Sequence, residues 1–169
     1  GTGSFSWSNA AIWTSRVPLP QDDVVISNAF IGTPTITMDM PRMGRSIDFS
    51  GGSGSQPTMT ATANSSIFGS LTLRSGGSYF NGNISFQGRG NFTLTTNGVT
   101  MPGSNIQLLA PGGKLTQGDD LTWSGNEFWA VIAGEWDTAG FDVTATDVAG
   151  VAAHSGTGTV TITGSTLSF

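Results

Sequence analysis

The sequence contains no cysteine, which excludes disulfide bonds and thiolate metal sites. Only 10% of its 169 residues are charged, and its longest apolar runs are too short for a transmembrane helix. The six basic residues are scattered along the chain: Arg16, Arg42, Arg45, Arg74, Arg89 and Lys114. Together with a net charge of −5, this scarcity argues against a nucleic-acid partner and against binding to an anionic membrane surface.

Motifs for nucleophilic catalysis and phosphate binding are also missing. The single histidine, His154, lies in a stretch rich in glycine and serine and has no nucleophile-elbow motif nearby. No glycine-rich segment has both the preceding strand and the following helix of a phosphate-binding loop. We therefore place His154 in an exposed loop, and we expect no enzyme activity and no cofactor.

The sequence is rich instead in small and β-branched residues. It has 25 glycines and many serines and threonines, while 37% of its residues are hydrophobic, too many for a disordered linker. Long helical periodicity is absent, and short alternating strands recur between Gly, Asn, Ser and Pro turns. These strands are expected at residues 35–38, 46–49, 58–60, 70–73, 83–86, 91–94, 105–108 and 120–123. The composition and the strands predict an all-β protein of one domain.

Apolar residues also recur with a longer period, about 22 residues, which lies in the range of structural repeats. Three ladders share this period: Leu71, Phe92, Leu115 and Trp136; Ile84, Ile106, Trp129 and Val151; and Val99, Leu121 and Val143. A shared long period is typical of a solenoid whose coils stack equivalent residues. We therefore predict a right-handed parallel β-solenoid (β-helix) with coils of about 22 residues and about three faces. The alternative is a β-sandwich, in which strands recur without coils.

The two ends of the predicted solenoid differ from its middle. Residues 1–66 fit the period less well, and we interpret them as an N-terminal cap followed by irregular first coils, with Trp7 and Trp13 covering the first coil. Residues 67–169 form the regular coils of the same continuous domain. The last strand, "TVTITGSTLSF", has no charge or proline to protect its edge. We therefore expect either a longer parent chain or a neighbouring subunit to cover this end.

Carboxylates provide the candidate catalytic residues. Asp120 and Asp142 are separated by one such period, so the solenoid would stack them on neighbouring coils, and a close carboxylate pair is what a retaining glycosidase uses. The competing interpretation, which we favour, is that both point to solvent without catalysing a reaction, because few long loops exist to build a groove. Neither Asp22–Asp23 nor Asp119–Asp120 has the ligand spacing of a known calcium loop, so no metal site is predicted.

Aromatic residues gather between positions 123 and 136. Trp129 and Trp136 are expected in the core, whereas Trp123 and Phe128 are left open, since an exposed ring could stack on a sugar. The candidate ligand-binding residues are Trp123, Asn126, Glu127 and Phe128. An ice-binding threonine array is not expected, because the outward series Thr72, Thr93 and Thr116 stops at Asp137, and Thr122 and Thr144 make only two rungs.

Several segments resemble modules of phage tail and tail-fibre proteins and of large bacterial surface adhesins. "GTGSFSWSNAAIW" followed by "VPLPQDDVVI" resembles the opening of such modules, and "IFGSLTLRSGG", "GEWDTAGFDVTATDVAG" and "GTGTVTITGSTLSF" fit their later parts. The chain departs from the pattern at "FWAVIAGEWD", where large aromatic residues replace small ones.

The resemblance implies a structural or receptor-binding role in a virion or on a cell surface. The partners that it implies are a surface glycan or receptor of a host cell, the rest of a longer parent chain, and further copies of the chain in a homotrimer. The expectation is a non-catalytic structural or recognition module. The alternative is a carbohydrate-binding or polysaccharide-degrading β-helix module.

Overall fold

The computed structural model describes residues 3–27, 29–30, 34–54, 57–62, 64–76, 80–102, 106–124, 129–145, 151–152 and 157–168. These residues form short strands and one 3-10 helix, η1 (Ala10–Ile12). The strands are β1 (Phe5–Ser6), β2 (Val24–Val25), β3 (Ala29–Phe30), β4 (Thr35–Met38), β5 (Arg42–Gly44), β6 (Ile47–Asp48), β7 (Ser53–Gly54), β8 (Thr58–Ala61), β9 (Ser65–Ile67), β10 (Leu71–Thr72), β11 (Phe80–Asn81), β12 (Ile84–Phe86), β13 (Asn91–Thr95), β14 (Thr100–Pro102), β15 (Ile106–Gln117), β16 (Leu121–Ser124), β17 (Trp129–Asp137), β18 (Val143–Ala145), β19 (Val151–Ala152), β20 (Thr157–Thr161) and β21 (Leu167–Ser168).

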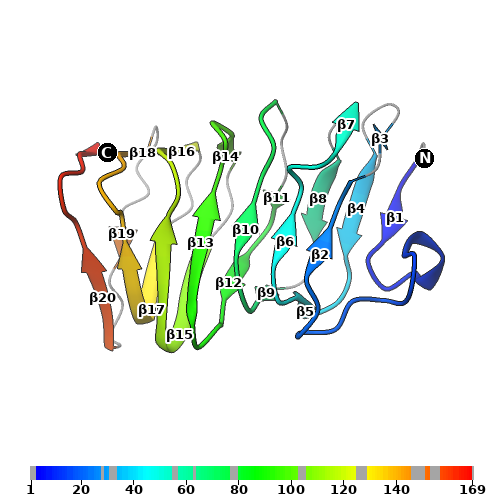
Figure 1. Ribbon diagram of the computed structural model, residues 1–169, viewed down its shortest axis with the longest axis horizontal. Helices are drawn as coiled ribbons and strands as arrows, with labels where there is room; N and C mark the ends of the chain where they lie inside the picture. Colours follow the sequence, from blue (N-terminus) through cyan, green and yellow to red (C-terminus); the bar gives the residue numbers. More distant parts are fainter. Residues whose placement is uncertain are drawn as a thin grey trace.

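The strands stack in parallel as the coils of a β-solenoid, as predicted (Figure 1). Three faces run along it, and we name each after an early strand. The β2 face continues through β6, β10, β13, the second halves of β15 and β17, and β20. The β4 face continues through β8 and β11, then β14, β16, β18 and β21. The β5 face continues through β9, β12, the first halves of β15 and β17, and β19.

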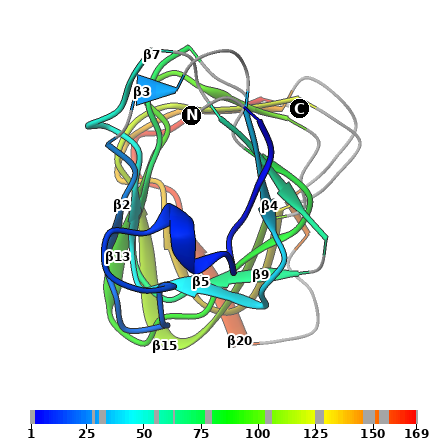
Figure 2. The same ribbon diagram turned by 90° about the vertical axis from the view of Figure 1, so that its right-hand side faces the viewer.

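The direction of the coil is visible from the N-terminal end. In Figure 2 the chain rises along the β2 face, crosses over and descends along the β4 face as it recedes from the viewer. This clockwise path makes the solenoid right-handed, the hand that parallel crossover connections favour. The repeat is about 23 residues, close to the expected length. Coils already stack from β2 onward, with Val24 opposite Ile47 and Ile47 opposite Leu71.

Two of the predicted ladders are present in the observed register. Ile84 pairs with Ile106, Ile106 with Trp129, and Trp129 with Val151. Leu121 pairs with Val143, and the pairing of Thr100 with Thr122 places the preceding Val99 in line with Leu121. Val99, Leu121 and Val143 are all buried. Alternating inward and outward side chains therefore build one apolar core along the axis.

The third ladder is correct for three of its four residues. Phe92 pairs with Leu115, and Leu115 with Trp136, but Leu71 pairs with Leu94 rather than with Phe92. The prediction of Leu71 in this column is therefore wrong by one inward position. The error has a simple cause. Phe92 and Leu94 are both apolar and inward on the same strand, so the alternation does not show which of them lies opposite Leu71.

Glycines form the corner between the β5 and β2 faces. A Cβ built on Gly88, Gly113 or Gly158 would lie 2.3–2.4 Å from a backbone oxygen of the preceding coil, and one on Gly134 would lie 2.5 Å from such an oxygen. Only glycine lets neighbouring coils approach this closely. The corner glycines therefore allow β15 and β17 to bend without leaving the stack.

Aromatic residues close the N-terminal end. Trp7 is fully buried, and the ring of Trp13 packs edge-on against it at a centroid distance of 4.7 Å. Trp13 Nε1 also donates a hydrogen bond to the Trp7 carbonyl oxygen at 2.8 Å. At the other end, β20 pairs with β17 and β21 with β18. No helix among the described residues has the length and apolar character needed to cross a membrane.

Candidate functional site

Asp120 and Asp142 lie on neighbouring coils, at the corner before β16 and β18. Asp120 Oδ1 accepts a hydrogen bond from the backbone N–H of Asp142 at 2.9 Å, and Asp142 Oδ1 accepts one from the N–H of Thr166 at 2.6 Å. Both aspartates are exposed. Each carboxylate thus joins its own coil to the next through the backbone, so the pair that was considered for catalysis, and expected not to catalyse a reaction, has a structural role in the stack.

Asp119 joins coils in the opposite direction. Its carboxylate accepts hydrogen bonds from the backbone N–H of Thr96 at 2.8 Å and from that of Asn97, which has a left-handed φ of 52°. Thr96 itself is buried, and its hydroxyl also lies within hydrogen-bond distance of Asp119. This carboxylate therefore satisfies the backbone of a tight turn in the preceding coil.

The other acidic pair considered for calcium, Asp22–Asp23, is engaged by arginines. Arg16 forms an ion pair with Asp22 at 2.8 Å, and Arg45 of the next coil pairs with Asp23. Across the described part of the chain, no three His, Cys, Asp or Glu residues gather in a group that could hold a metal ion.

Trp123 belongs to the core. It is inward on β16 and only 4% exposed, so its ring is not available as a platform for a sugar. This burial removes Trp123 from the candidate ligand-binding set. The other members, Asn126, Glu127 and Phe128, lie outside the described residues, as does His154. Trp136, which was expected in the core, is 1% exposed.

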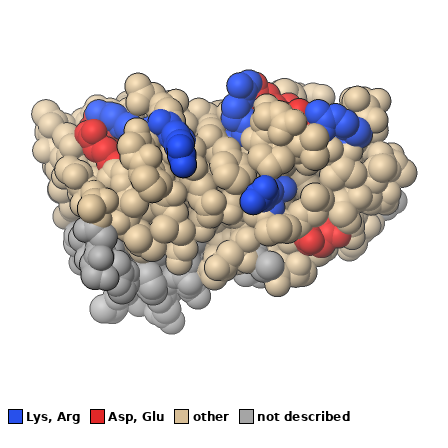
Figure 3. All heavy atoms as spheres, turned by 90° about the horizontal axis from the view of Figure 1, so that it is seen from below, with Lys and Arg blue, Asp and Glu red and all other residues tan. Residues whose placement is uncertain are grey.

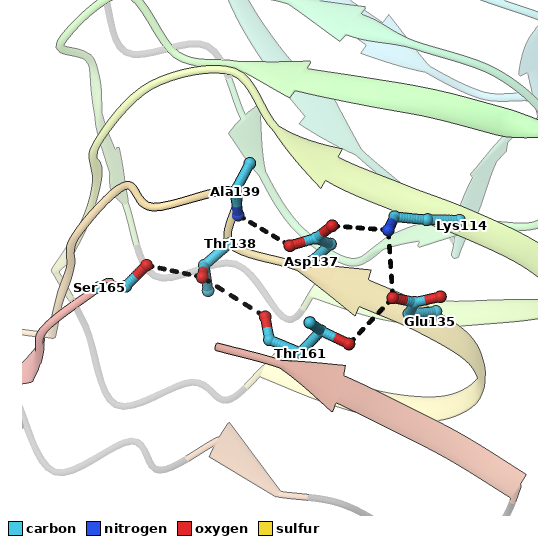
Figure 4. A network of polar contacts seen from close by, with 7 residues as sticks. All are labelled: Lys114, Glu135, Asp137, Thr138, Ala139, Thr161 and Ser165. Carbon is cyan, nitrogen blue, oxygen red and sulfur yellow. Dashed lines mark hydrogen bonds and ion pairs between the residues drawn. The ribbon is translucent and has the colours of Figure 1, made fainter. Parts of the chain in front are cut away.

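A polar cluster that sequence analysis did not assemble lies on the outer side of the β2 face (Figure 4). Lys114 Nζ lies 2.6 Å from Asp137 Oδ2 and 3.2 Å from Glu135 Oε1. Thr161, one coil further on, donates its hydroxyl hydrogen to Glu135 Oε1 at 2.9 Å. The cluster therefore connects three successive coils, those of β15, β17 and β20.

In this cluster Lys114 and Asp137 each stabilise the charged form of the other. Hydrogen bonding to Lys114 and to the backbone N–H of Ala139 lowers the pKa of Asp137. Hydrogen bonding to Asp137 and Glu135 raises the pKa of Lys114. A general acid would need the opposite shift of its carboxyl pKa. These shifts favour ion pairs between coils, and we call the group of Lys114, Glu135, Asp137 and Thr161 the Lys114 clamp.

The sequence does contain a signal for this clamp. Lys114 and Glu135 have the same separation along the chain as Leu115 and Trp136 in the adjacent core column. A basic and an acidic residue at outward positions one repeat apart are the pattern that indicates such an ion pair.

Outward hydroxyl groups form longer columns than expected. On the β4 face Thr100, Thr122, Thr144 and Ser168 pair in succession, four rungs where the sequence indicated two. On the β2 face Thr93, Thr116, Asp137 and Thr161 pair in succession, whereas Thr72 pairs with Thr95 and lies in a different column. The outer surface is thus polar but carries few charges.

Charged groups are spread over this surface. The side shown in Figure 3 carries separate groups of Lys and Arg divided by neutral surface, with acidic groups beside several of them. Three of the basic residues form ion pairs with acidic residues: Arg16 with Asp22, Arg45 with Asp23, and Lys114 with Glu135 and Asp137. The view shows no continuous basic field of the kind that binds a polyanion.

Comparisons of the chain with models of protein families, with curated proteins and with solved structures give no significant match.

Proposed function

We propose that the chain is a non-catalytic structural and recognition module of a phage virion, in a tail or fibre, or of a bacterial surface protein, and that it contacts a host surface glycan or receptor. The observation that carries this proposal is the use of the candidate catalytic carboxylates. Asp120 and Asp142 bind backbone N–H groups of the following coil, and so contribute to the assembly of the stack.

The surface supports the recognition part of the proposal. Its outward columns are rich in threonine hydroxyls, which donate and accept hydrogen bonds as glycan hydroxyls do. The regular coil also fits a spacer, because each coil contacts mainly its neighbours and coils can be added without changing the fold. The resemblance to phage tail and bacterial adhesin modules agrees with both roles, and the location that it implies is a virion or the outside of a cell.

An array of bacterial surface polysaccharides tests the recognition part. We expect the purified, fluorescently labelled chain to bind a small number of related glycans in a saturable manner. The heat-unfolded chain is the control and should bind none of them. An array on which the folded and unfolded chains bind alike would contradict the proposal.

Polysaccharide degradation is the second candidate function, because Asp120 and Asp142 do lie on adjacent coils. It requires that one carboxyl act as an acid and the other as a nucleophile or base. In that case replacing Asp120 or Asp142 with Asn would abolish the release of reducing ends from a polysaccharide substrate.

Exposed apolar surface beside β20 supports self-association as part of the proposal. Strand β20 pairs with β17, Ile162 beside it is 46% exposed, and described residues 157–168 contain no charged side chain. Natural proteins protect open strand edges with charge, proline or a covering element. We expect a trimer in light scattering, the state implied by the resemblance, and we expect Ile162→Lys to weaken it. A strictly monomeric chain at high concentration would contradict this expectation.

A further inference from the structure

The N-terminal cap forms an open cavity of about 520 Å³ beside the first coil. The cap is the dark blue segment nearest the viewer in Figure 2. The cavity lies where the loop after η1 meets β2, and its volume is within the range of small-ligand sites. Its lining residues all belong to one continuous segment, from Trp13 to Val25, and all of them are described.

One part of the lining is apolar and fixed in place. Trp13 is held by its hydrogen bond to the Trp7 carbonyl and by ring contact with the buried Trp7. Val25, on the outward side of β2, is 61% exposed, and the buried Pro18 also lines the cavity. An indole ring held in one orientation can stack on a ligand at little cost in side-chain entropy.

The rest of the lining is polar and also ordered. The guanidinium of Arg16 binds Asp22 through two nitrogen atoms, each 2.8 Å from a carboxylate oxygen. Asp22 Oδ2 accepts a further hydrogen bond from the N–H of Leu19 at 2.8 Å. A two-pronged pairing of this kind fixes the planes of both groups. Gln21 and the hydroxyls of Thr14 and Ser15 add further donors and acceptors around the cavity.

Opposite charges are balanced around the cavity. Arg16 neutralises Asp22, and Arg45 of the next coil binds Asp23, its Nε lying 2.8 Å from Asp23 Oδ1. Hydrogen bonding to Arg45 also lowers the pKa of Asp23 and so favours the charged form of this carboxyl. Such a site offers polar contacts without a net charge to attract an anion or a cation.

We infer that this cavity, the cap pocket, binds a neutral pyranose unit of a glycan. A pyranose ring has an apolar face of C–H groups, which fits the Trp13 and Val25 surface, and a rim of hydroxyls, which fits Arg16, Asp22 and Gln21. The inference rests on the proposed recognition function and assigns it to residues 13–25. It places binding at the N-terminal end, far along the chain from the aromatic cluster at 123–136.

The test uses amide chemical shifts of the whole isotope-labelled chain during titration with methyl pyranosides. The probes are methyl α-D-glucopyranoside, methyl α-D-mannopyranoside, methyl β-D-galactopyranoside and the methyl glycoside of N-acetyl-β-D-glucosamine, with methyl β-D-glucuronide as a charged comparison. We expect saturable shifts at residues 13–25 with at least one neutral probe, at a millimolar dissociation constant, and weaker binding of the glucuronide.

Variants of Val25 provide a matched pair for this test. Val25→Glu places a charge on the apolar surface and should weaken binding about tenfold or more. Val25→Thr keeps the branched shape but places a hydroxyl on the apolar surface, so it should weaken binding less than Val25→Glu does. Because Val25 is largely exposed, both variants should fold, and their amide spectra outside the cap should match that of the parent. Gln21→Ala should also weaken binding.

The outcomes distinguish the pocket from the proposed function. Shifts at 13–25 that Val25→Glu removes support the pocket. If no probe moves these amides while the chain still binds polysaccharides on the array, the pocket is wrong and the recognition function stands. If neither readout detects binding, both fail. Shifts confined to residues 106–145 would overturn the pocket and place glycan binding on later coils.

Discussion

At the scale of single residues, outward polar side chains join neighbouring coils. Asp120 and Asp142 bind the backbone of the next coil, Asp119 that of the preceding one, and Lys114 binds Asp137. Backbone N–H groups at the corners cannot all find partners in the parallel ladder, so side-chain acceptors supply the rest. The carboxylates that suggested catalysis are thus explained by the needs of the turns.

The pKa shifts in the Lys114 clamp predict how stability depends on pH. The pKa of Asp137 is lowered from its ordinary 3.8, so its contribution to stability is present above about pH 4 and is lost as the pH falls through the lowered value. The pKa of Lys114 is raised from 10.5, so its contribution is present below that pH and is lost as the pH rises through the raised value.

Thermal melts of Asp137→Asn across this range test the assignment. We expect its melting temperature to lie a few degrees below that of the natural chain at pH 7 and to fall less on acidification. Thr93 lies in the same outward column and opposite Thr116, whereas Asn91 is the residue opposite Lys114, so Thr93→Ala should keep the natural acid dependence. An acid dependence that is identical in Asp137→Asn and the natural chain would remove Asp137 from the explanation.

At the scale of elements, the sequence predicted strands better than it predicted their partners. The strand expected at 35–38 is β4 with identical bounds, and the Ile84 and Leu121 ladders have the expected register. The prediction for Leu71 failed because a period of two places two inward residues, Phe92 and Leu94, in the same short segment, and a coil length that varies slightly cannot choose between them. The register is chosen by coil length and corner geometry, which depend on the preceding coil.

The candidate site was less predictable than the strands. Trp123 is two residues after the inward Leu121 on the same strand, so the alternation of the strand already predicts that it is buried. The sequence was therefore sufficient to exclude Trp123 from the candidate ligand-binding residues. The cap pocket was not foreseeable, because it depends on how the loop after η1 folds back beside β2. No periodic pattern describes such a loop, and its shape follows from the contacts of Trp13, Arg16 and Asp22.

The glycine corner gives a prediction at this scale. Gly113→Ala would place a methyl group 2.4 Å from the Gly88 carbonyl oxygen, and we expect it to lower the free energy of unfolding by about 1–3 kcal/mol. Gly90→Ala is the matched control, because nothing lies within 4 Å of its added Cβ, and it should change stability by less than about 0.5 kcal/mol. Urea denaturation measures both, and equal effects would contradict the close approach of coils at this corner.

At the scale of the whole molecule, the chain forms a rod of stacked coils with a closed N-terminal end and a polar outer surface. Trp7 and Trp13 close that end, and their packing also shapes the cap pocket. Stability is spread over many equivalent contacts between coils, so the surface can vary while the core columns keep the fold. This distribution of residues agrees with the function that we propose, recognition without catalysis.

The decisive measurement for recognition without catalysis is the release of reducing ends from polysaccharides that the chain binds on the array. We predict binding with no reducing ends above the level of the heat-unfolded chain, because Asp120 and Asp142 are engaged with the backbone of the stack. Release of reducing ends by the folded chain, abolished in Asp120→Asn or Asp142→Asn while binding to the same polysaccharide persists, would refute this function and establish an enzyme.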